Sequence, residues 1–301
     1  MACAPGFGIP YIHTSTKPAA AGASWKVLIM SEMQGLQDWT LDNVPFDLID
    51  HSRVRHREDL FYMVVGASFV EIAADLYTRN LIEFYDDDPE VKTWLEDKWQ
   101  HEELRHGRVL KAYSQAVWPD FNWESAYQAF FEEYSKLCTL DELEPTQGLE
   151  MVARCVVETG TATFYTALSR QATEPVLAGI AQRIRADEVG HYKYFFRYFR
   201  KYRARQSTGR WQVFQALKRR ILEVRQSDAD CALWHVYRMH RGEAASRPEF
   251  QRLCRRLARQ LRRHYPVEMA VKMVTRPLDL PVLVNRMVTA PLARASGWLL
   301  R

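Results

Sequence analysis

The stretches WQHEELRHG, residues 99–107, and ADEVGH, residues 186–191, decide how this chain folds. Each places a glutamate three residues before a histidine: Glu103 before His106, and Glu188 before His191. On an α-helix, positions i and i+3 share a face, so each pair can present one carboxylate and one imidazole to the same metal ion. The spacing therefore predicts two helices that each supply a Glu-x-x-His pair.

Two further glutamates interrupt apolar runs. Glu71 lies within SFVEIAA, residues 68–74, and Glu158 lies within VVETGT, residues 156–161. Burying an unpaired carboxylate is costly. The chain order Glu, Glu-x-x-His, Glu, Glu-x-x-His is that of the di-iron and di-manganese carboxylate sites of four-helix bundles. Carboxylate and imidazole donors without a thiolate favour iron or manganese over zinc. The predicted metal ligands are Glu71, Glu103, His106, Glu158, Glu188 and His191.

Apolar residues recur at helical spacing around these positions, which predicts an all-α bundle. The expected helices span residues 25–36, 58–84, 89–117, 123–137, 146–173, 176–205, 209–226, 229–241 and 247–264. Residues 1–24 read as a flexible tail and residues 25–301 as a single domain. Within this domain, the bundle core covers about residues 57–206 and a C-terminal helical extension about residues 207–301.

An acidic residue stands directly before the glutamate of each Glu-x-x-His pair: Glu102 and Asp187. A metal-bound histidine usually donates its other N–H to a carboxylate. We therefore expect Asp187 to orient His106 and Glu102 to orient His191. The alternative is that both acidic side chains face water.

The bulk composition, 47% hydrophobic and 26% charged, is that of an ordinary globular protein. The five cysteines include no CxxC pair, which indicates free thiols in a reducing compartment. The first 25 residues lack the charged and apolar regions of a signal peptide, and no run of 18 apolar residues marks a transmembrane helix. The sequence thus predicts a cytoplasmic protein without a transmembrane segment.

The charges are distributed unevenly along the chain. Residues 1–191 carry 16 Lys and Arg against 30 Asp and Glu, whereas residues 192–263 carry 20 against 5, a balance of +15. A basic block of this size favours an acidic partner. The alternative is a solvated helix face.

The motifs resemble those of the soluble acyl-acyl-carrier-protein desaturases (fatty acid desaturase type 2), within the ferritin-like superfamily. EELRHG, residues 102–107, is similar to that family's EENRHG, and DEVGH, residues 187–191, is similar to its DEKRH. Trp99 matches a tryptophan that the family places four residues before the ligand glutamate. Thr161 falls where the family has a threonine beside the metals. The resemblance covers about residues 57–200.

The resemblance implies a homodimeric di-iron enzyme with two iron ions, for which manganese is an alternative. It implies that O₂ is used to desaturate an acyl chain on acyl carrier protein, with electrons from a ferredoxin-type donor. The residues to which we assign a catalytic role are Thr161, Asp187 and Trp99. Both expected partners are acidic, so the basic side chains that follow the second Glu-x-x-His are candidates for docking them: Lys193, Arg197, Arg200 and Lys201.

Three other functions stay open. The first is hydroxylation or another oxygenation of a small molecule or a carrier-bound acid. N-oxygenases of the arylamine type carry an extra histidine where this chain has Ile184, which counts against them. The second is a ferritin-like protein that handles iron or peroxide, although such proteins are generally shorter. The third is nucleic-acid binding, which the basic block permits, but we expect no specific nucleic-acid recognition.

Overall fold

The computed structural model describes residues 39–138, 143–223 and 228–281. These residues belong to a compact unit that begins at Trp39. The predicted helix at residues 25–36, the expected boundary after residue 24 and the end of the C-terminal extension beyond residue 281 lie outside the described residues. The proposed division into a tail and one domain therefore stays a prediction.

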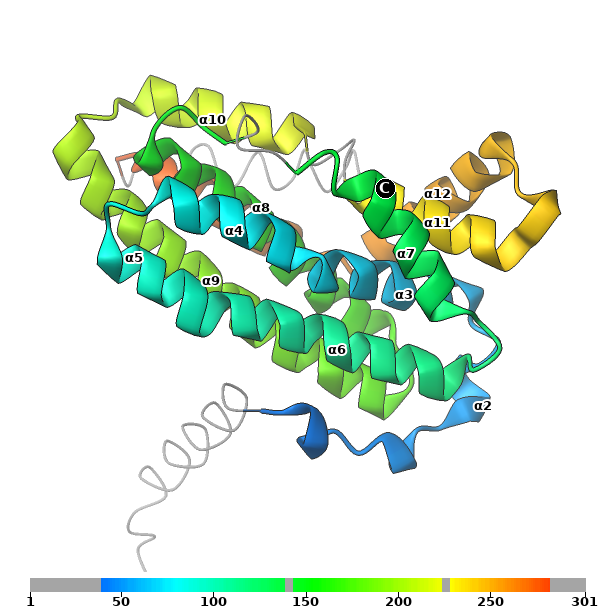
Figure 1. Ribbon diagram of the computed structural model, residues 1–301. Helices are drawn as coiled ribbons and strands as arrows, with labels where there is room; N and C mark the ends of the chain where they lie inside the picture. Colours follow the sequence, from blue (N-terminus) through cyan, green and yellow to red (C-terminus); the bar gives the residue numbers. More distant parts are fainter. Residues whose placement is uncertain (1–38, 139–142, 224–227, 282–301) are drawn as a thin grey trace, which may run out of the picture. The chain divides into compact units, whose positions relative to one another are not determined.

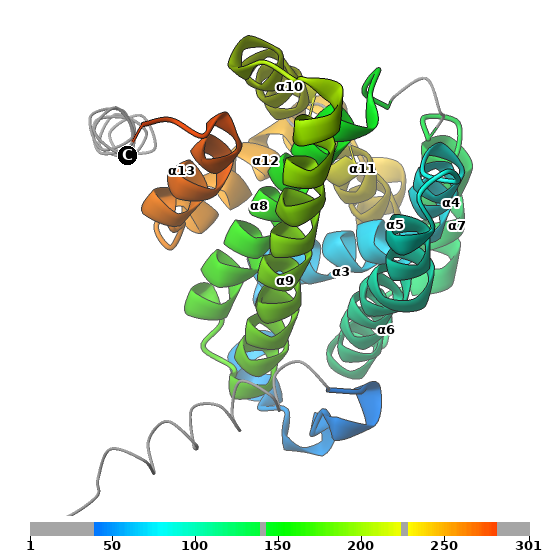
Figure 2. The same cartoon turned by 90° about the vertical axis from the view of Figure 1, so that its left-hand side faces the viewer.

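Four long helical segments form the bundle that the sequence predicts (Figure 1). The most extensive packing joins α8 (Gln147–Gln171) to α9 (Pro175–Gln206), and the next joins α3 (Glu58–Ile72) to α6 (Gln100–Val117). Seen from the side, α8 and α9 run together, with α6 and α3 next to them (Figure 2). Each of these four helices carries one or more of the predicted metal ligands.

The helix ends follow from local capping signals. The Asp88 side chain accepts a hydrogen bond from the Val91 N–H, and Pro89 begins α5 (Pro89–Trp94). Thr146 caps α8 through the Leu149 N–H. Glu174 caps α9 by accepting from two backbone N–H groups, at 2.8 and 3.0 Å, and Pro175 follows it. The Asp88 and Glu174 carboxylates also interact favourably with the positive ends of the helix dipoles.

Two helices predicted as continuous are interrupted. The segment at residues 58–84 breaks at Ala73 into α3 and α4 (Ala74–Phe84), and the segment at residues 89–117 contains a π-helical turn, η3 (Leu95–Trp99), between α5 and α6. The break coincides with a close approach of α6. A Cβ atom added at Gly107 would lie 2.4 Å from Ile72 Cγ1 and 2.7 Å from the Ile72 backbone nitrogen. π-helical turns such as η3 are frequent at functional sites.

Shorter helices cover the bundle. Among them, α11 packs on α3 and α7, whereas α10 and α13 pack on α8. Their bounds are α7 Trp123–Tyr134, α10 Arg210–Glu223, α11 Asp228–Arg241, α12 Arg247–Arg262 and α13 Val267–Thr275. The start of the described chain is made of short turns: η1 Leu41–Asn43, η2 Phe46–Leu48 and α2 His51–Val54. Short turns also follow α11 and α13: η5 Gly242–Ala244 and η6 Arg276–Leu278.

Within the described residues, one helical stretch is long and apolar enough to cross a membrane by length and composition alone. It is Glu58–Phe84, with a mean hydropathy of 1.5 over its most apolar window, of which 67% is buried inside the protein. Core helices of bundles have the same composition. In this structure the stretch packs against α6 and α11.

Candidate metal centre

The fold brings all six predicted ligands together in the middle of the bundle. They form two groups, and in each group the donor atoms lie within 4.8 Å of one another. The first group is Glu71, Glu103, His106 and Glu188, and the second is Glu103, Glu158, Glu188 and His191. Glu103 and Glu188 belong to both groups. Two metal ions held by these groups would therefore share the Glu103 and Glu188 carboxylates.

The histidine Nδ1 atoms face the carboxylates at close range. His106 Nδ1 lies 3.1 Å from Glu188 Oε1 and 3.7 Å from Glu71 Oε2. His191 Nδ1 lies 3.0 Å from Glu103 Oε1 and 3.5 Å from Glu158 Oε2. The centroids of the two imidazole rings are 6.0 Å apart.

Several polar atoms at the centre are buried without a hydrogen-bond partner among the described residues. Among the described residues, four buried atoms at the centre make no hydrogen bond: His106 Nδ1, His191 Nδ1, Glu158 Oε2 and Glu188 Oε1. Leaving such atoms unsatisfied is costly in a protein interior. Two divalent cations would satisfy them and would also balance the four carboxylates. The donor set, oxygen and imidazole nitrogen, suits iron or manganese.

Crowding of acids in a dry site shifts the pKa values of the ligands. Burial, together with the neighbouring Glu188 carboxylate, raises the pKa of Glu103 well above its usual range and that of Glu158 to about 8. Burial alone would lower the pKa of His106 and His191, but the surrounding carboxylates raise the pKa of both well above the usual range. These shifts favour the protonated forms of Glu103, Glu158, His106 and His191 when no metal is bound.

The acidic residues before the two ligand glutamates cross over to the opposite histidine. Asp187 Oδ2 lies 3.0 Å from His106 Nε2, and Glu102 Oε2 lies 2.9 Å from His191 Nε2. These are the contacts that the sequence predicted, and both acids are buried instead of facing water. Burial would raise the pKa of Asp187 and of Glu102, but the adjacent histidine lowers the pKa of each. The role of the two acids in orienting bound ligands stays a prediction.

Three residues that sequence reasoning did not select complete the surroundings of the centre. Trp39 Nε1 donates to Asp187 Oδ2 at 2.9 Å, and its ring stacks on His106. Arg105 donates to the same oxygen at 2.8 Å. Tyr165 donates to Glu71. Tyr165 stands seven residues after Glu158, on the same face of α8, so helical spacing could have found it. No sequence signal connects Trp39 to residues 106 and 187.

The two other predicted catalytic residues also contact ligands. Trp99 Nε1 donates to Glu158 Oε1 at 3.2 Å. The Thr161 hydroxyl lies within hydrogen-bonding distance of the Glu188 carboxylate and also 3.2 Å from the carbonyl oxygen of Glu158. It can thus donate to the metal centre or back to its own helix. Their catalytic roles stay predictions.

The basic side chains proposed for docking lie on the C-terminal part of α9 and do not line the cavity at the centre. Two of them are engaged by acids at the start of α5. Arg197 lies 3.3 Å from Glu90, and Lys201 lies 2.9 Å from both Asp88 and Glu90. Lys193 and Arg200 are exposed. The structure thus does not bring these four side chains to the cavity wall.

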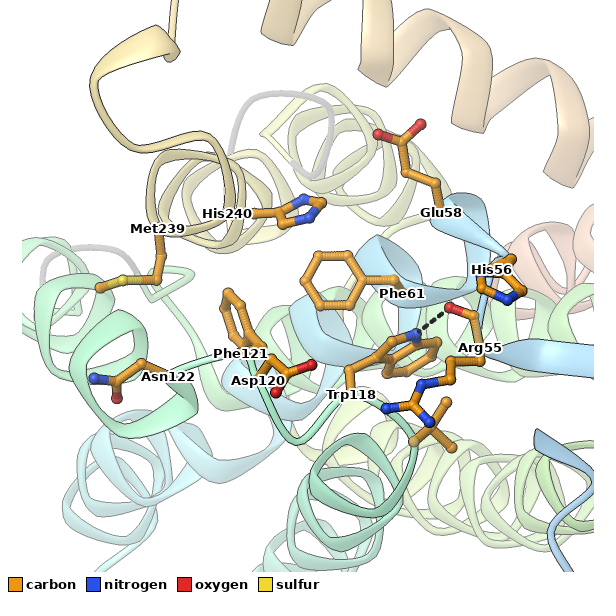
Figure 3. A pocket seen from close by; sticks show the side chains of 11 residues that line it. Arg55, His56, Glu58, Phe61, Trp118, Asp120, Phe121, Asn122, Met239 and His240 are labelled. Carbon is orange, nitrogen blue, oxygen red and sulfur yellow. Dashed lines mark hydrogen bonds between the residues drawn. The ribbon is translucent and has the colours of Figure 1, made fainter. Parts of the chain in front are cut away.

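A cavity of about 380 Å³ opens on the centre, and its wall includes Glu71, Glu103, Glu158 and Glu188 as well as Thr161. Another cavity, of about 480 Å³, lies around Phe61, Trp118 and His240 (Figure 3). Phe61 stands ten residues before Glu71, about 15 Å along α3 at 1.5 Å per residue. We therefore assign the functional site to the cavity that the carboxylates line.

The helical bundle has a ferritin-like fold, and its two buried groups of carboxylates and histidines could hold two metal ions. No protein-family model and no curated protein matches the chain. Among solved structures, it is similar to the R2-like ligand-binding oxidase. A tyrosine-to-phenylalanine variant of that protein, with an aerobically reconstituted Mn/Fe cofactor, has a TM-score of 0.52 at 13% sequence identity, covering 89% of this chain and 98% of that one.

Two further variants of the same oxidase align less closely. One, with an anaerobically reconstituted Mn/Fe cofactor, has a TM-score of 0.43 at 12% identity and covers 92% of this chain and 93% of that one. The other, with an aerobically reconstituted Fe/Fe cofactor, also has a TM-score of 0.43 at 12% identity and covers 95% and 98%. At this identity the first likeness shows the fold and not the activity. Membership of the desaturase family stays a prediction.

Replacing Asp187 with asparagine is expected to lower the affinity for metal by about 10- to 100-fold, the usual cost of losing a partner of a ligand histidine. Asp187 Oδ2 accepts from Trp39 and Arg105 and lies beside His106. An amide replaces one of the carboxylate oxygens with an N–H₂ group and cannot serve these donors equally. Anaerobic titration with Fe(II) measures the effect, and Asp97→Asn, an exposed site in η3, is the matched control. Wild-type affinity in Asp187→Asn would remove the orienting role.

Proposed function

We propose that this chain is an O₂-dependent di-metal oxidase that acts on an unactivated C–H pair of an organic substrate. The observation that carries the proposal is that four of the six predicted ligands line a cavity. A volume of about 380 Å³ lies within the range of small-molecule sites, about 300–1,000 Å³. Handling of iron or peroxide alone needs no such space, so the cavity favours an oxidase over a storage protein.

Glu71, Glu103, His106, Glu158, Glu188 and His191 would hold two iron ions, with manganese as the alternative for one or both. A solved structure with a similar fold carries a Mn/Fe cofactor, which supports this choice. Bound iron would supply the redox chemistry that reduces O₂. Protein side chains would hold the ligands in place: Asp187 and Glu102 on the histidines, Tyr165 on Glu71 and Trp99 on Glu158.

We propose desaturation of an acyl chain carried on acyl carrier protein as the specific reaction, on the strength of the sequence motifs. Two hydrogens leave adjacent carbons, and O₂ takes these hydrogens, two electrons and two protons to form two water molecules. A ferredoxin-type donor would supply the electrons. Thr161 lines the cavity and reaches Glu188, so its hydroxyl can pass a proton between them. Hydroxylation needs the same reactants but inserts one oxygen atom and releases one water.

Hydroxylation of a smaller, more polar substrate is the second candidate. The cavity wall contains Tyr77, Asn80 and Arg154 besides its apolar residues. Polar groups at this position favour a substrate with polar groups over a bare hydrocarbon chain.

Mass spectrometry after incubation with iron-loaded protein, O₂ and a reducing system tests the proposal. Acyl chains carried on acyl carrier protein and free fatty acids of the same chain lengths are offered in parallel. Loss of two hydrogens identifies a desaturase, and gain of one oxygen identifies a hydroxylase. Glu188→Gln is the inactive control. Thr161→Val should form less product for each O₂ consumed, whereas Thr161→Ser should form as much product for each O₂ as the wild type does. Iron-loaded protein that leaves every substrate unchanged would contradict the proposal.

Docking of an acidic carrier protein is a separate part of the proposal, supported by the excess of basic residues after residue 191. Lys193 and Arg200 are exposed, and neither takes part in the ion pairs that hold Arg197 and Lys201 to Asp88 and Glu90. In the same assay, reversing both charges should raise the Michaelis constant for carrier-bound substrates and leave that for free acids unchanged. Equal Michaelis constants for the variant and the wild type would show that Lys193 and Arg200 do not dock the carrier protein.

A further inference from the structure

A further group of potential metal ligands lies where α7 and α11 pack against each other, outside the candidate metal centre (Figure 1). Glu133 of α7 and Cys231 and His235 of α11 each present one donor atom, and the three atoms lie within 4.8 Å of one another. This group shares no residue with the six ligands of the candidate metal centre. It also differs from them in chemistry, because it contains a thiol.

The spacing on α11 places two of the three donors on one face of the helix. Cys231 and His235 stand four residues apart, so their side chains are neighbours on the helix surface. His235 Nε2 lies 2.9 Å from Glu133 Oε2, and the His235 side chain is only 5% exposed. The imidazole packs edge-to-face against Phe130 of α7, with ring centroids 6.4 Å apart. Contacts with α7 therefore hold the imidazole in place beside the thiol and the carboxylate.

Acidic groups surround the thiol of this group. Cys231 is a free cysteine and is partly buried. Burial and the carboxylates of Glu133 and Asp228 raise the pKa of the Cys231 thiol to about 12, whereas the Arg247 guanidinium acts in the opposite direction. Two carboxylates and one guanidinium thus act on the thiol, so its surroundings favour a cation. A divalent cation would bind Cys231 as the thiolate, whereas a hydrogen bond between His235 and Glu133 alone does not involve Cys231.

We propose that Glu133, Cys231 and His235 bind a zinc ion, with water as the fourth ligand. Thiolate, imidazole and carboxylate groups are the ligands that zinc takes in proteins, and three of them with one water complete a tetrahedral site. A thiolate donor favours zinc, whereas the oxygen and imidazole donors of the candidate metal centre favour iron or manganese. The two kinds of site would therefore select different metals.

A zinc ion at this position would tie α7 to α11 beside the cavity of the candidate metal centre. Tyr134 follows Glu133 on α7 and lines that cavity. Asp228, about one turn before Cys231 on α11, lines it as well. The same α11 packs on α3, the helix that carries Glu71. The zinc ion would thus hold the cavity wall in position, and its binding does not depend on the proposed oxidase activity.

Cobalt(II) binding without O₂ tests the proposal, because cobalt occupies zinc sites and absorbs in the near ultraviolet when a thiolate binds it. Co(II) is titrated into protein already loaded with Fe(II). The six ligands of the candidate metal centre include no cysteine, so cobalt that enters that centre gives no such band. The wild type should show the thiolate band, and excess Zn(II) should abolish it. Cys231→Ser should lack the band, whereas Cys254→Ser, the matched control on α12, should retain it.

Glu133→Gln distinguishes the loss of a ligand from the loss of the fold, because the Glu133 side chain is 54% exposed. This variant should bind Co(II) at least about tenfold more weakly, since even the loss of a ligand's hydrogen-bond partner costs about 10- to 100-fold. Glu132→Gln, at the exposed neighbouring position, is the matched control and should bind as the wild type does.

Absence of the thiolate band in the wild type would overturn the proposal, as would its persistence in Cys231→Ser or in excess Zn(II). Equal Co(II) affinity of Glu133→Gln and the wild type would overturn it as well. Because the assay contains neither O₂ nor an organic substrate, a failure of the oxidase proposal leaves these results unaffected, and the two hypotheses can be judged separately.

Discussion

Glu188→Gln is expected to lower the affinity for both metal ions by more than about 100-fold, since even the loss of a histidine's hydrogen-bond partner costs about 10- to 100-fold. Glu188 belongs to both groups of donor atoms, and its Oε1 is one of the buried atoms without a hydrogen bond in the described part of the chain. Glutamine has nearly the same size but carries no charge. The substitution thus removes a carboxylate that would be shared by both metal ions, with little change in packing.

Comparison with ligands of a single group makes this prediction sharper. Glu71 belongs only to the first group and Glu158 only to the second, so Glu71→Gln and Glu158→Gln should each retain one metal ion. Elemental mass spectrometry after anaerobic loading and gel filtration measures whether each chain holds two metal ions, one or none. Glu83→Gln, exposed on α4, should retain two. Two tightly bound ions in Glu188→Gln would show that Glu188 does not bridge them.

Metal affinity is expected to rise steeply with pH up to about pH 8. The pKa of Glu158 is raised to about 8, so this carboxyl is largely protonated at neutral pH when no metal is bound, and the pKa of Glu103 is shifted in the same direction. Metal must displace those protons. Each displaced proton changes the affinity by about tenfold per pH unit, and the raised pKa values of His106 and His191 strengthen this dependence. Titrations in buffers of different ionisation enthalpy measure the number released, and a pH-independent affinity would contradict the proposed protonation.

The stability of the metal-free protein should change with pH in the opposite direction. The folded-state pKa of Glu158, about 8, lies above its value of 4.5 in the unfolded chain. Between these values the folded state binds a proton that the unfolded state has lost, so the free energy of unfolding falls as pH rises through this window. The raised pKa values of His106 and His191 act in the same direction. Thermal unfolding with and without metal at several pH values checks the sign.

Spacing along the chain was enough to predict which glutamates and histidines cluster in the bundle, because the positions of side chains on a helix depend only on local sequence. A Glu-x-x-His pair on a helix faces one direction whatever surrounds it. Two such pairs, each preceded by a glutamate in an apolar helix, can only be buried if the carboxylates meet. The crossed contacts of Asp187 with His106 and of Glu102 with His191 follow from the same symmetry.

The interruptions of the helices could not be predicted in this way. Helical periodicity hardly changes across Ala73 or across residues 95–99, so the sequence favours continuous helices there. The break at Ala73 lies next to Ile72, which Gly107 of α6 approaches closely. Close packing between helices decided this feature, and such packing depends on residues distant in the chain.

The sequence by itself thus determined the class of fold, the six glutamates and histidines that the fold brings together and the two acids beside the histidines, because helical spacing places side chains on defined faces. Only the tertiary structure decided that Trp39 reaches Asp187, that Tyr165 reaches Glu71, and that Glu133 lies close to Cys231 and His235. The basic residues after His191 show the same limit, since their charge is evident in the sequence but their distance from the cavity is not. Contacts between distant segments arise from how the helices pack, and no local pattern encodes them.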